Sequence, residues 1–224
     1  MLLKMMENGE QIDEVIFFDT GMEFFSIYSI MKQIQTVLEA QHIKFTRLKA
    51  NKDFLYLMLE HQVKHRDGSQ SCGYKWCGGQ CRWYTSQKQI TISKYLKERY
   101  PDGVIQCIGI ASDEQIRILR NSEKRMPLVE YGMTERDCLD YCHSKGYFWM
   151  EGESELYDHL DRVSCWCCRN KNLKELREIY SHFKVYWFAL CELESRCGMN
   201  MKSKSLRELE SEFKKEKIEN LKLF

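Results

Sequence analysis

The stretch "EVIFFDTGMEF", Glu14 to Phe24, decides the fold class of this 224-residue chain. Its opening run is nearly all apolar and rich in strand formers, which is typical of a strand buried on both faces of a parallel sheet. "DTG" follows this strand at once. Apolar residues between Ser26 and Ala40 then recur at helical spacing, and "IKFTRL", Ile43 to Leu48, alternates like a second strand. Strand, helix and strand in this order predict an α/β protein.

The following sixty residues extend this pattern and interrupt it once. Phe54 to Val63 and Ile90 to Arg99 have helical patterns, and "GVIQCIGIA", Gly103 to Ala111, indicates a third buried strand. Residues 64–85 are rich in glycine, basic and aromatic residues, and a loop of this length is usually functional or mobile. Its first part, Lys64 to Cys77, has the composition of a nucleic-acid-binding segment. A lid over a nucleotide is an equally simple interpretation.

A helix with a recognisable start opens the second half of the chain. Thr134 stands three residues before Asp137, in the manner of a capping box. The pattern predicts a helix over Glu135–Lys145 that closes at Gly146. We therefore divide the chain into an α/β domain, residues 1–130, and a helical part that begins at residue 131.

This helical, cysteine-rich part covers residues 131–224. Apolar residues from Leu173 to Phe188 fall on one face of a single predicted helix. The tail, Ser205 to Phe224, has the pattern of a charged amphipathic helix. Such a helix is suited to docking on a protein partner or on a second copy of the chain.

Composition narrows the classes of protein that this chain can belong to. The hydrophobic share is 43%, the charged share 30% and the formal net charge +1, which is ordinary for a globular protein and gives no overall field toward nucleic acid or membrane. The sequence offers no apolar run long enough to span a bilayer, and its first residues do not have the pattern of a signal peptide. We therefore expect a cytoplasmic protein without membrane association.

The chain contains 11 cysteines, and some of them are clustered. In a reducing compartment, clustered cysteines favour metal binding or redox work over structural disulfides.

Three motifs occur together in an informative order. They are "VIFFDTGMEF" (Val15–Phe24), "IGIASDEQIR" (Ile108–Arg117), and "MPLVEYGMTERDCLDYC" (Met126–Cys142) ahead of "SCWCCRNKNLKELR" (Ser164–Arg177). In this order and spacing the chain resembles the phosphoadenosine phosphosulfate (PAPS) reductase family, from about residue 2 to residue 190. The resemblance implies the PP-loop fold, a doubly wound and mainly parallel sheet. It also implies an adenine nucleotide, ATP or PAPS, as substrate.

Two departures from the family pattern bear on activity. The family's Ser-Gly-Gly-Lys-Asp-Ser phosphate loop is not in this sequence, and "LLKMMENG", Leu2 to Gly9, resembles the end of the helix that follows that loop. The reductase nucleophile, in a Glu-Cys-Gly motif, has only a partial counterpart in "RCGMN", Arg196 to Asn200. The chemistry expected from the resemblance is therefore of the sulfonucleotide reductase type or of the ATP-dependent adenylyl or sulfur-transfer type, with catalytic residues unassigned. The alternative is a non-catalytic, metal-stabilised remnant that acts as a binding or scaffolding protein.

The residues after the first strand are the first candidate ligand-binding group. In open α/β sheets, ligands bind beyond the carboxyl ends of the strands. Such an end carries Asp19, Thr20 and Glu23. The resemblance implies that these residues contact ribose, base or metal. An ordinary Asp-x-Gly turn is the alternative interpretation.

The resemblance supplies two further groups of candidate nucleotide ligands. Gly109 permits close approach of a ligand to the backbone, and the planar guanidinium of Arg117 suits a bidentate clamp on phosphate or sulfate. The alternative interpretation is that Arg117 and the acidic residues before it form the exposed first turn of a helix. "CRWYTSQK", Cys81 to Lys88, resembles the family's Arg-Trp-Cys-Thr…Lys segment, in which Trp83 is best explained as a core residue. The remaining candidates in these two groups are Asp113, Glu114, Arg82 and Lys88.

Three cysteines in four positions form the candidate metal site. Tetrahedral zinc sites and iron–sulfur clusters both commonly use four thiolates. The fourth family thiolate falls at Tyr84, so Cys81 or Cys77 would replace it, or an imidazole from His143 or His159. Small hydrophobic residues in a core are the alternative, and a strained disulfide between near neighbours is disfavoured. The predicted ligands are Cys81, Cys165, Cys167 and Cys168.

Overall fold

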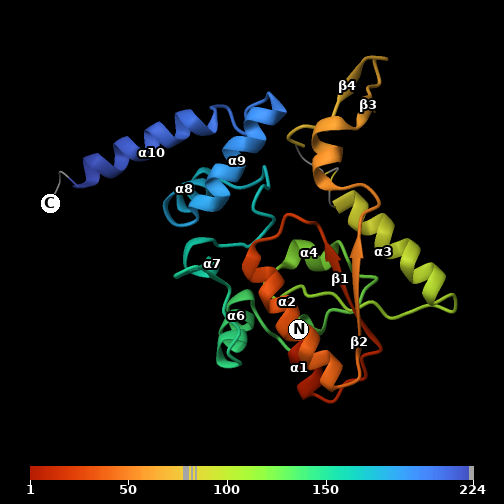
Figure 1. Cartoon of the computed structure of the whole chain (residues 1–224). Coiled ribbons are helices and arrows are strands. Elements are labelled where there is room, and N and C mark those ends of the chain that lie inside the picture. Colours follow the sequence, from red (N-terminus) through yellow and green to blue (C-terminus); the bar gives the residue numbers. More distant parts are fainter. Residues whose placement is uncertain (78–80, 82, 84, 222–224) are drawn as a thin grey trace. The chain divides into compact units, whose positions relative to one another are not determined.

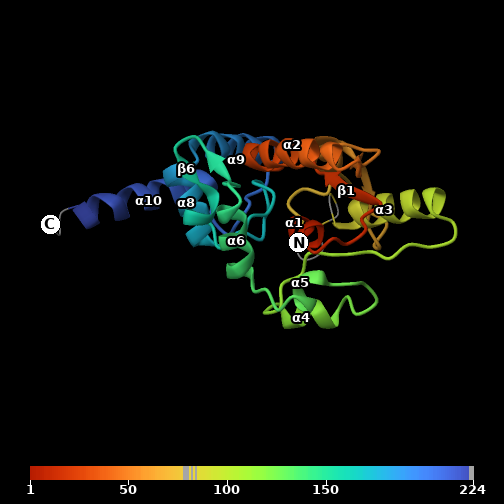
Figure 2. The ribbon, with the colours of Figure 1, turned by 90° about the horizontal axis from the view of Figure 1, so that it is seen from below.

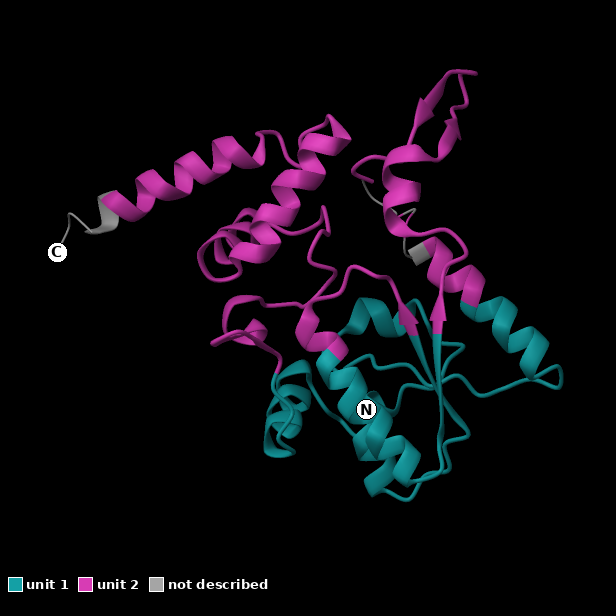
Figure 3. Ribbon diagram, in the orientation of Figure 1, with its two compact units in different colours: residues 1–17, 29–47, 92–148 teal, residues 18–28, 48–91, 149–224 magenta. Residues whose placement is uncertain are grey.

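The structure is a computed structural model that describes residues 1–77, 81, 83 and 85–221 (Figure 1). These residues form a mixed α/β chain, which confirms the predicted class. They divide into two compact units, each built from three segments of the sequence (Figure 3). Unit 1 comprises residues 1–17, 29–47 and 92–148, and unit 2 comprises residues 18–28, 48–91 and 149–224. Each unit includes residues on both sides of the predicted boundary at residue 130.

A strand–helix–strand unit forms the N-terminal third, as predicted. Strands β1 and β2 pair in parallel, and α2 connects them. This is the connection that parallel strands require. The elements that lie wholly or partly in unit 1 are α1 (Leu2–Glu7), β1 (Glu14–Asp19), α2 (Phe25–Ala40), β2 (Lys44–Lys49), α3 (Thr85–Arg99), α4 (Gln115–Leu119), α5 (Pro127–Glu130) and α6 (Glu135–Ser144).

The prediction of a third strand over Gly103–Ala111 is wrong. Within unit 1 this segment makes one isolated parallel bridge, between Cys107 and Arg125. Val104 and Ile105 are 47% and 79% exposed, so the first part of this apolar run is open to solvent, whereas Ile110 and Ala111 at its end are buried. Sheets in the described part of the chain are accordingly two-stranded, and they show no large doubly wound sheet.

A polar network fixes β1 against its neighbours in unit 1. The Glu14 carboxylate accepts hydrogen bonds from Lys44 at 2.8 Å and from the hydroxyls of Tyr95 and Tyr100 at 2.7 Å each. Burial raises the pKa of this carboxyl, but hydrogen bonds from Lys44, Thr46 and the two tyrosines outweigh it and bring the pKa to about 2.

The predicted start of α6 is confirmed. The Thr134 side chain accepts a hydrogen bond from the backbone N–H of Asp137, and the Asp137 carboxylate accepts one from the backbone N–H of Thr134. This reciprocal capping box satisfies two donors at the helix N-terminus. Gly146, at φ +82°, follows the helix end as expected.

Unit 2 holds the strand ends and most of the C-terminal half. The helix predicted over Phe54–Val63 is confirmed as far as Glu60, mostly as the short π-helix η1. The antiparallel β3–β4 hairpin, which was not predicted, takes up the end of that range and the first part of the predicted loop. The elements wholly in unit 2 are η1 (Tyr56–Glu60), β3 (Gln62–Lys64), β4 (Gln70–Cys72), β5 (Met150–Glu151), β6 (Ser154–Glu155), α7 (Leu156–His159), α8 (Leu173–His182), α9 (Lys184–Cys197) and α10 (Leu206–Leu221).

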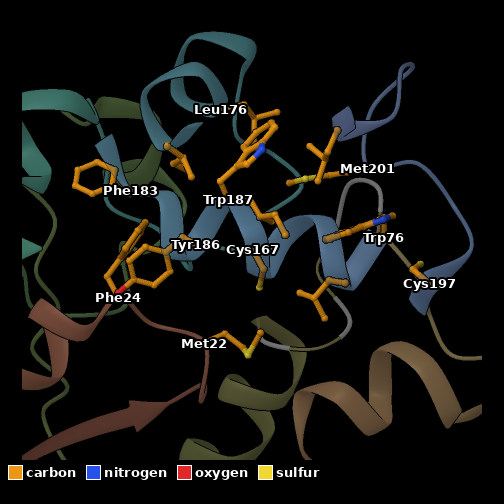
Figure 4. Packing of buried hydrophobic residues seen from close by; sticks show 14 of the residues in the cluster. Met22, Phe24, Trp76, Cys167, Leu176, Phe183, Tyr186, Trp187, Cys197 and Met201 are labelled. Carbon is orange, nitrogen blue, oxygen red and sulfur yellow. The ribbon is translucent and has the colours of Figure 1, made fainter. Parts of the chain in front are cut away.

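The single helix predicted over Leu173–Phe188 is two helices. The chain leaves helical geometry at Phe183, with φ −122° and ψ 58°, so that α8 ends and α9 begins there. Phe183 is only 3% exposed and packs edge-on against Phe24, at 6.3 Å between ring centroids. The break therefore places an aromatic ring in the core, where Trp187 is fully buried as well (Figure 4).

Helices α8, α9 and α10 lie together at the C-terminal end of unit 2 (Figures 1 and 2). The buried Glu194 of α9 holds the turn into α10, because its two carboxylate oxygens accept the backbone N–H groups of Met201 and Leu206, each at 2.8 Å. The tail helix, expected from Ser205, is confirmed over Leu206–Leu221. Among the described residues, none of the helices has the length and apolar character needed to cross a bilayer.

Candidate functional site at the strand ends

A cavity of about 260 Å³ opens directly after β1 and β2. It lies entirely within unit 2. Buried apolar side chains, Phe54 and Trp83 among them, line it together with the polar residues Thr20, Lys49 and Lys52. A wider hollow of about 580 Å³ shares Lys52 with this cavity and adds Arg196. The carboxyl ends of the parallel strand pair thus carry a pocket, as the sequence pattern predicts for α/β proteins.

Asp19 holds the shape of the loop after β1. Its buried carboxylate accepts the backbone N–H of Gly21 and the hydroxyl of Tyr28, each at 2.8 Å, and pairs with Lys49 at 3.4 Å. Gly21 adopts φ +74°, a conformation that glycine reaches without steric cost. Asp19 therefore positions Thr20 and Lys49 at the cavity.

Glu23 joins this loop to the cysteine segment. Its carboxylate Oε1 accepts a hydrogen bond from the Thr20 hydroxyl at 2.7 Å and lies 3.8 Å from the Cys165 thiol. Burial raises the pKa of Glu23, against the opposing effects of the Thr20 hydrogen bond and the positive charge of Lys88. Two groups that are more than 140 residues apart in the sequence, the strand-end acids and the cysteine cluster, are therefore adjacent in unit 2.

The cysteine segment is partly buried, and neighbouring acidic groups and thiols act on Cys165. Burial is the largest cause of the raised pKa of Cys165, and Glu23, Cys168 and Cys81 add to it. Cys167 is fully buried within the core of unit 2 (Figure 4). The charges of Cys81 and Cys168, both in unit 2, thus act on the Cys165 thiol.

A buried lysine accompanies these thiols. The Lys171 side chain is fully buried, donates to the Ser164 hydroxyl at 3.1 Å and lies 5.5 Å from the centre of the Phe24 ring. Burial lowers its pKa, while Glu175 and the three thiols of the Cys165–Cys168 segment oppose that effect. A cation in this position would stabilise thiolate charge.

Ligand atoms of the four predicted metal-binding cysteines do not converge. Among the described residues, one group of three or more His, Cys, Asp and Glu side chains has its ligand atoms all within 4.8 Å of one another, and it is His159, Glu178 and His182. The thiols have the donor chemistry for zinc or an iron–sulfur cluster, and a closed site would require them to move together. His143 belongs to unit 1, where its ring stacks on Phe148 at 4.8 Å between ring centroids.

The other predicted nucleotide ligands do not all belong to the unit that contains the cavity. Gly109, Asp113, Glu114 and Arg117 all belong to unit 1. There Arg117 forms an ion pair with Glu114, and Asp113 accepts the backbone N–H of Glu135 at 3.1 Å. Lys88 belongs to unit 2. Arg82 and Tyr84 lie outside the described residues.

Sequence reasoning missed the residues that follow β2. Lys49, Lys52 and Asp53 line the cavity beside the loop that follows β1. The rule that singled out Asp19 and Thr20, namely position after a parallel strand, applies equally to them. Trp83 is 3% exposed and packs edge-on against Phe54 at 4.9 Å, which confirms its prediction as a core residue.

Comparison with models of known protein families, with curated proteins and with solved structures finds no match for this chain.

Proposed function

We propose that the strand-end cavity binds an adenine nucleotide, ATP or PAPS. The chemistry proposed for it is of the sulfonucleotide reductase type or of the ATP-dependent adenylyl or sulfur-transfer type. The observation that carries the proposal is the position of the cavity at the carboxyl ends of two parallel strands, β1 and β2. The strand–helix–strand connection through α2 is also the repeating unit of doubly wound sheets, and on this basis we propose a fold of the PP-loop type.

Cavity size and chemistry are compatible with part of a nucleotide. A volume of about 260 Å³ is near the lower end of small-ligand pockets, which begin at roughly 300 Å³. Base and ribose would therefore occupy it, against the apolar surface that Phe54 and Trp83 provide. The phosphates would extend toward the adjoining hollow, where Lys52 and Arg196 supply positive charge.

We further propose that Cys81, Cys165, Cys167 and Cys168 hold zinc or an iron–sulfur cluster. The electrostatic proximity of Cys165 to Cys81 and Cys168 supports this, as does the buried Lys171 beside the thiols. Protein purified without oxygen should then carry about one equivalent of zinc, or a matching amount of iron and sulfide. Less than about a tenth of an equivalent of either metal would contradict the proposal.

Photolabelling tests the nucleotide proposal directly. An 8-azidoadenosine nucleotide, irradiated with the full chain and followed by peptide mapping, should label residues 18–22 or 49–55, and excess ATP or PAPS should suppress that label. Labelling confined to other segments, or labelling that neither nucleotide suppresses, would contradict the proposal. In that case the alternative, a non-catalytic binding or scaffolding role, would explain the chain better.

A further inference from the structure

Two histidines and a glutamate meet in unit 2, next to the segment that carries three cysteines. The Nδ1 atom of His159 lies 3.0 Å from Oε2 of Glu178, and the Nε2 atom of His182 lies 3.6 Å from the same oxygen. One ligand atom from each residue falls within 4.8 Å of the other two. This convergence involves residues that are up to 23 positions apart in the sequence.

Well-packed helices position the three side chains. Glu178 and His182 stand four residues apart on α8 and therefore share a face. The N-terminus of α8 is fixed by a reciprocal capping box between Asn172 and Glu175. His159 ends α7, and Leu160, which follows it, is only 1% exposed. The backbone on both sides of the group is thus anchored by burial and capping.

The donor set is that of a transition-metal site. Two imidazoles and one carboxylate, from two separate helices, are ligands that zinc accepts in three-ligand sites completed by a solvent molecule. The side chains of His159, Glu178 and His182 are 19%, 26% and 41% exposed, so a solvent ligand has access. We propose that His159, Glu178 and His182 bind a divalent transition-metal ion of the zinc class, with solvent completing its coordination.

Charges of both signs act on the group. Lys184 and Lys217 act on His182 and oppose a bound cation, so the Glu178 carboxylate has to offset them. The imidazole rings stack at 3.8 Å between centroids and 22° between planes. Coordination requires them to turn about their side-chain bonds until both nitrogens face one ion.

An ion here would close a loop. His159 lies just before residues 160–172, and Glu178 and His182 lie just after them. That segment contains Cys165, Cys167 and Cys168. Because a cross-link across a loop restricts the unfolded chain more than the folded one, the bound ion would stabilise the cysteine segment. The two sites differ in donor chemistry, nitrogen and oxygen here and sulfur there, so they can be measured separately.

Cobalt(II) is the probe that distinguishes the His159–Glu178–His182 site from the cysteine site. In the full chain under anaerobic conditions, we expect Co²⁺ to give visible bands of nitrogen and oxygen coordination, distinct from thiolate-to-cobalt charge transfer, and Zn²⁺ to displace it. The variants His159→Gln, Glu178→Gln and His182→Gln should each weaken this binding by at least about tenfold, the effect that even indirect ligand partners have. His65→Gln, the matched control at an exposed position of the β3–β4 hairpin, should bind as the native chain does. Native-like affinity in all three variants, or spectra of thiolate type only, would overturn the proposal.

A second measurement needs no variant. Diethyl pyrocarbonate modifies accessible imidazoles, and peptide mapping locates the modified residues. Zn²⁺ should protect His159 and His182 from the reagent and leave the exposed His65 unprotected. Equal modification of His159 and His182 with and without Zn²⁺ would overturn the proposal even if the variants fail to fold.

Discussion

The thiol of Cys165 lies 3.8 Å from the carboxylate of Glu23, so the loop after β1 touches the cysteine segment directly. The same carboxylate accepts the hydroxyl of Thr20, which lines the strand-end cavity. A nucleotide site and a cysteine site would therefore share one acidic residue. This relationship is the reason to test the two proposed sites together.

The buried lysine provides a test of the cysteine site. Lys171→Met should weaken metal retention by at least about tenfold, because it removes the cation that stabilises thiolate charge while keeping the volume of the side chain. Competition with a chromogenic chelator measures this. Lys174→Met is the matched control, since Lys174 is exposed and pairs with Asp161. Equal retention in both variants would mean that Lys171 does not act on bound metal.

Removal of Glu194 should destabilise unit 2. Glu194→Ala leaves the backbone N–H groups of Met201 and Leu206 buried without their acceptor, which we expect to lower the free energy of unfolding by about 2–4 kcal/mol. Urea unfolding followed by tryptophan fluorescence reports on this unit, because all 5 tryptophans lie in it. Glu192→Ala, at an exposed position of the same helix, should change the midpoint little. A similar loss in both variants would refute the assigned role.

Two glycines near the β3–β4 hairpin give a steric comparison. Gly68 and Gly73 both have positive φ, so alanine at either position costs about 1–2 kcal/mol. A Cβ on Gly73 would also meet the carbonyl oxygen of Met58 at 2.0 Å, whereas one on Gly68 meets nothing within 4 Å. Gly73→Ala should therefore cost about 1–3 kcal/mol more than Gly68→Ala in the same urea experiment. Equal costs would show that the backbone yields at Met58.

Acid should weaken unit 1 through Glu14. The pKa of this carboxyl is about 2 in the folded chain against an ordinary 4.5. A group whose pKa is lower in the folded state stabilises the fold above its unfolded value, and this contribution disappears as the pH falls from about 4.5 toward 2. Hydrogen exchange of unit 1 peptides, corrected for intrinsic rates, should show declining protection over that range. Glu14→Gln should weaken this pH dependence, and the exposed Glu39→Gln should retain it. A steep acid dependence in Glu14→Gln would assign it to other groups.

Elements fixed by nearby residues could be predicted from the sequence. The apolar run of β1, the helical spacing of α2 and the alternation of β2 each depend on neighbouring positions. The Thr134–Asp137 capping box depends on two residues three apart, and the structure confirms it. Local chemistry determines these features, so a single sequence is enough to predict them.

Features that depend on distant contacts could not be predicted. At the break, the ring of Phe183 packs against Phe24, a contact that no helical pattern reveals. Gly103–Ala111 has the composition of a buried strand, but composition cannot say whether a partner strand lies beside it. The contact between Glu23 and Cys165 likewise joins segments that show no relation in sequence.

Calorimetric titration measures nucleotide binding at the strand ends without a label. ATP or PAPS, titrated into the full chain, should bind with saturation at one site per chain. Lys52→Ala should weaken that binding by about tenfold or more, because a charge-assisted hydrogen bond is lost, whereas Lys64→Ala, outside the cavity, should not. Absence of saturable binding by either nucleotide, or equal affinities in the two variants, would contradict the proposed site.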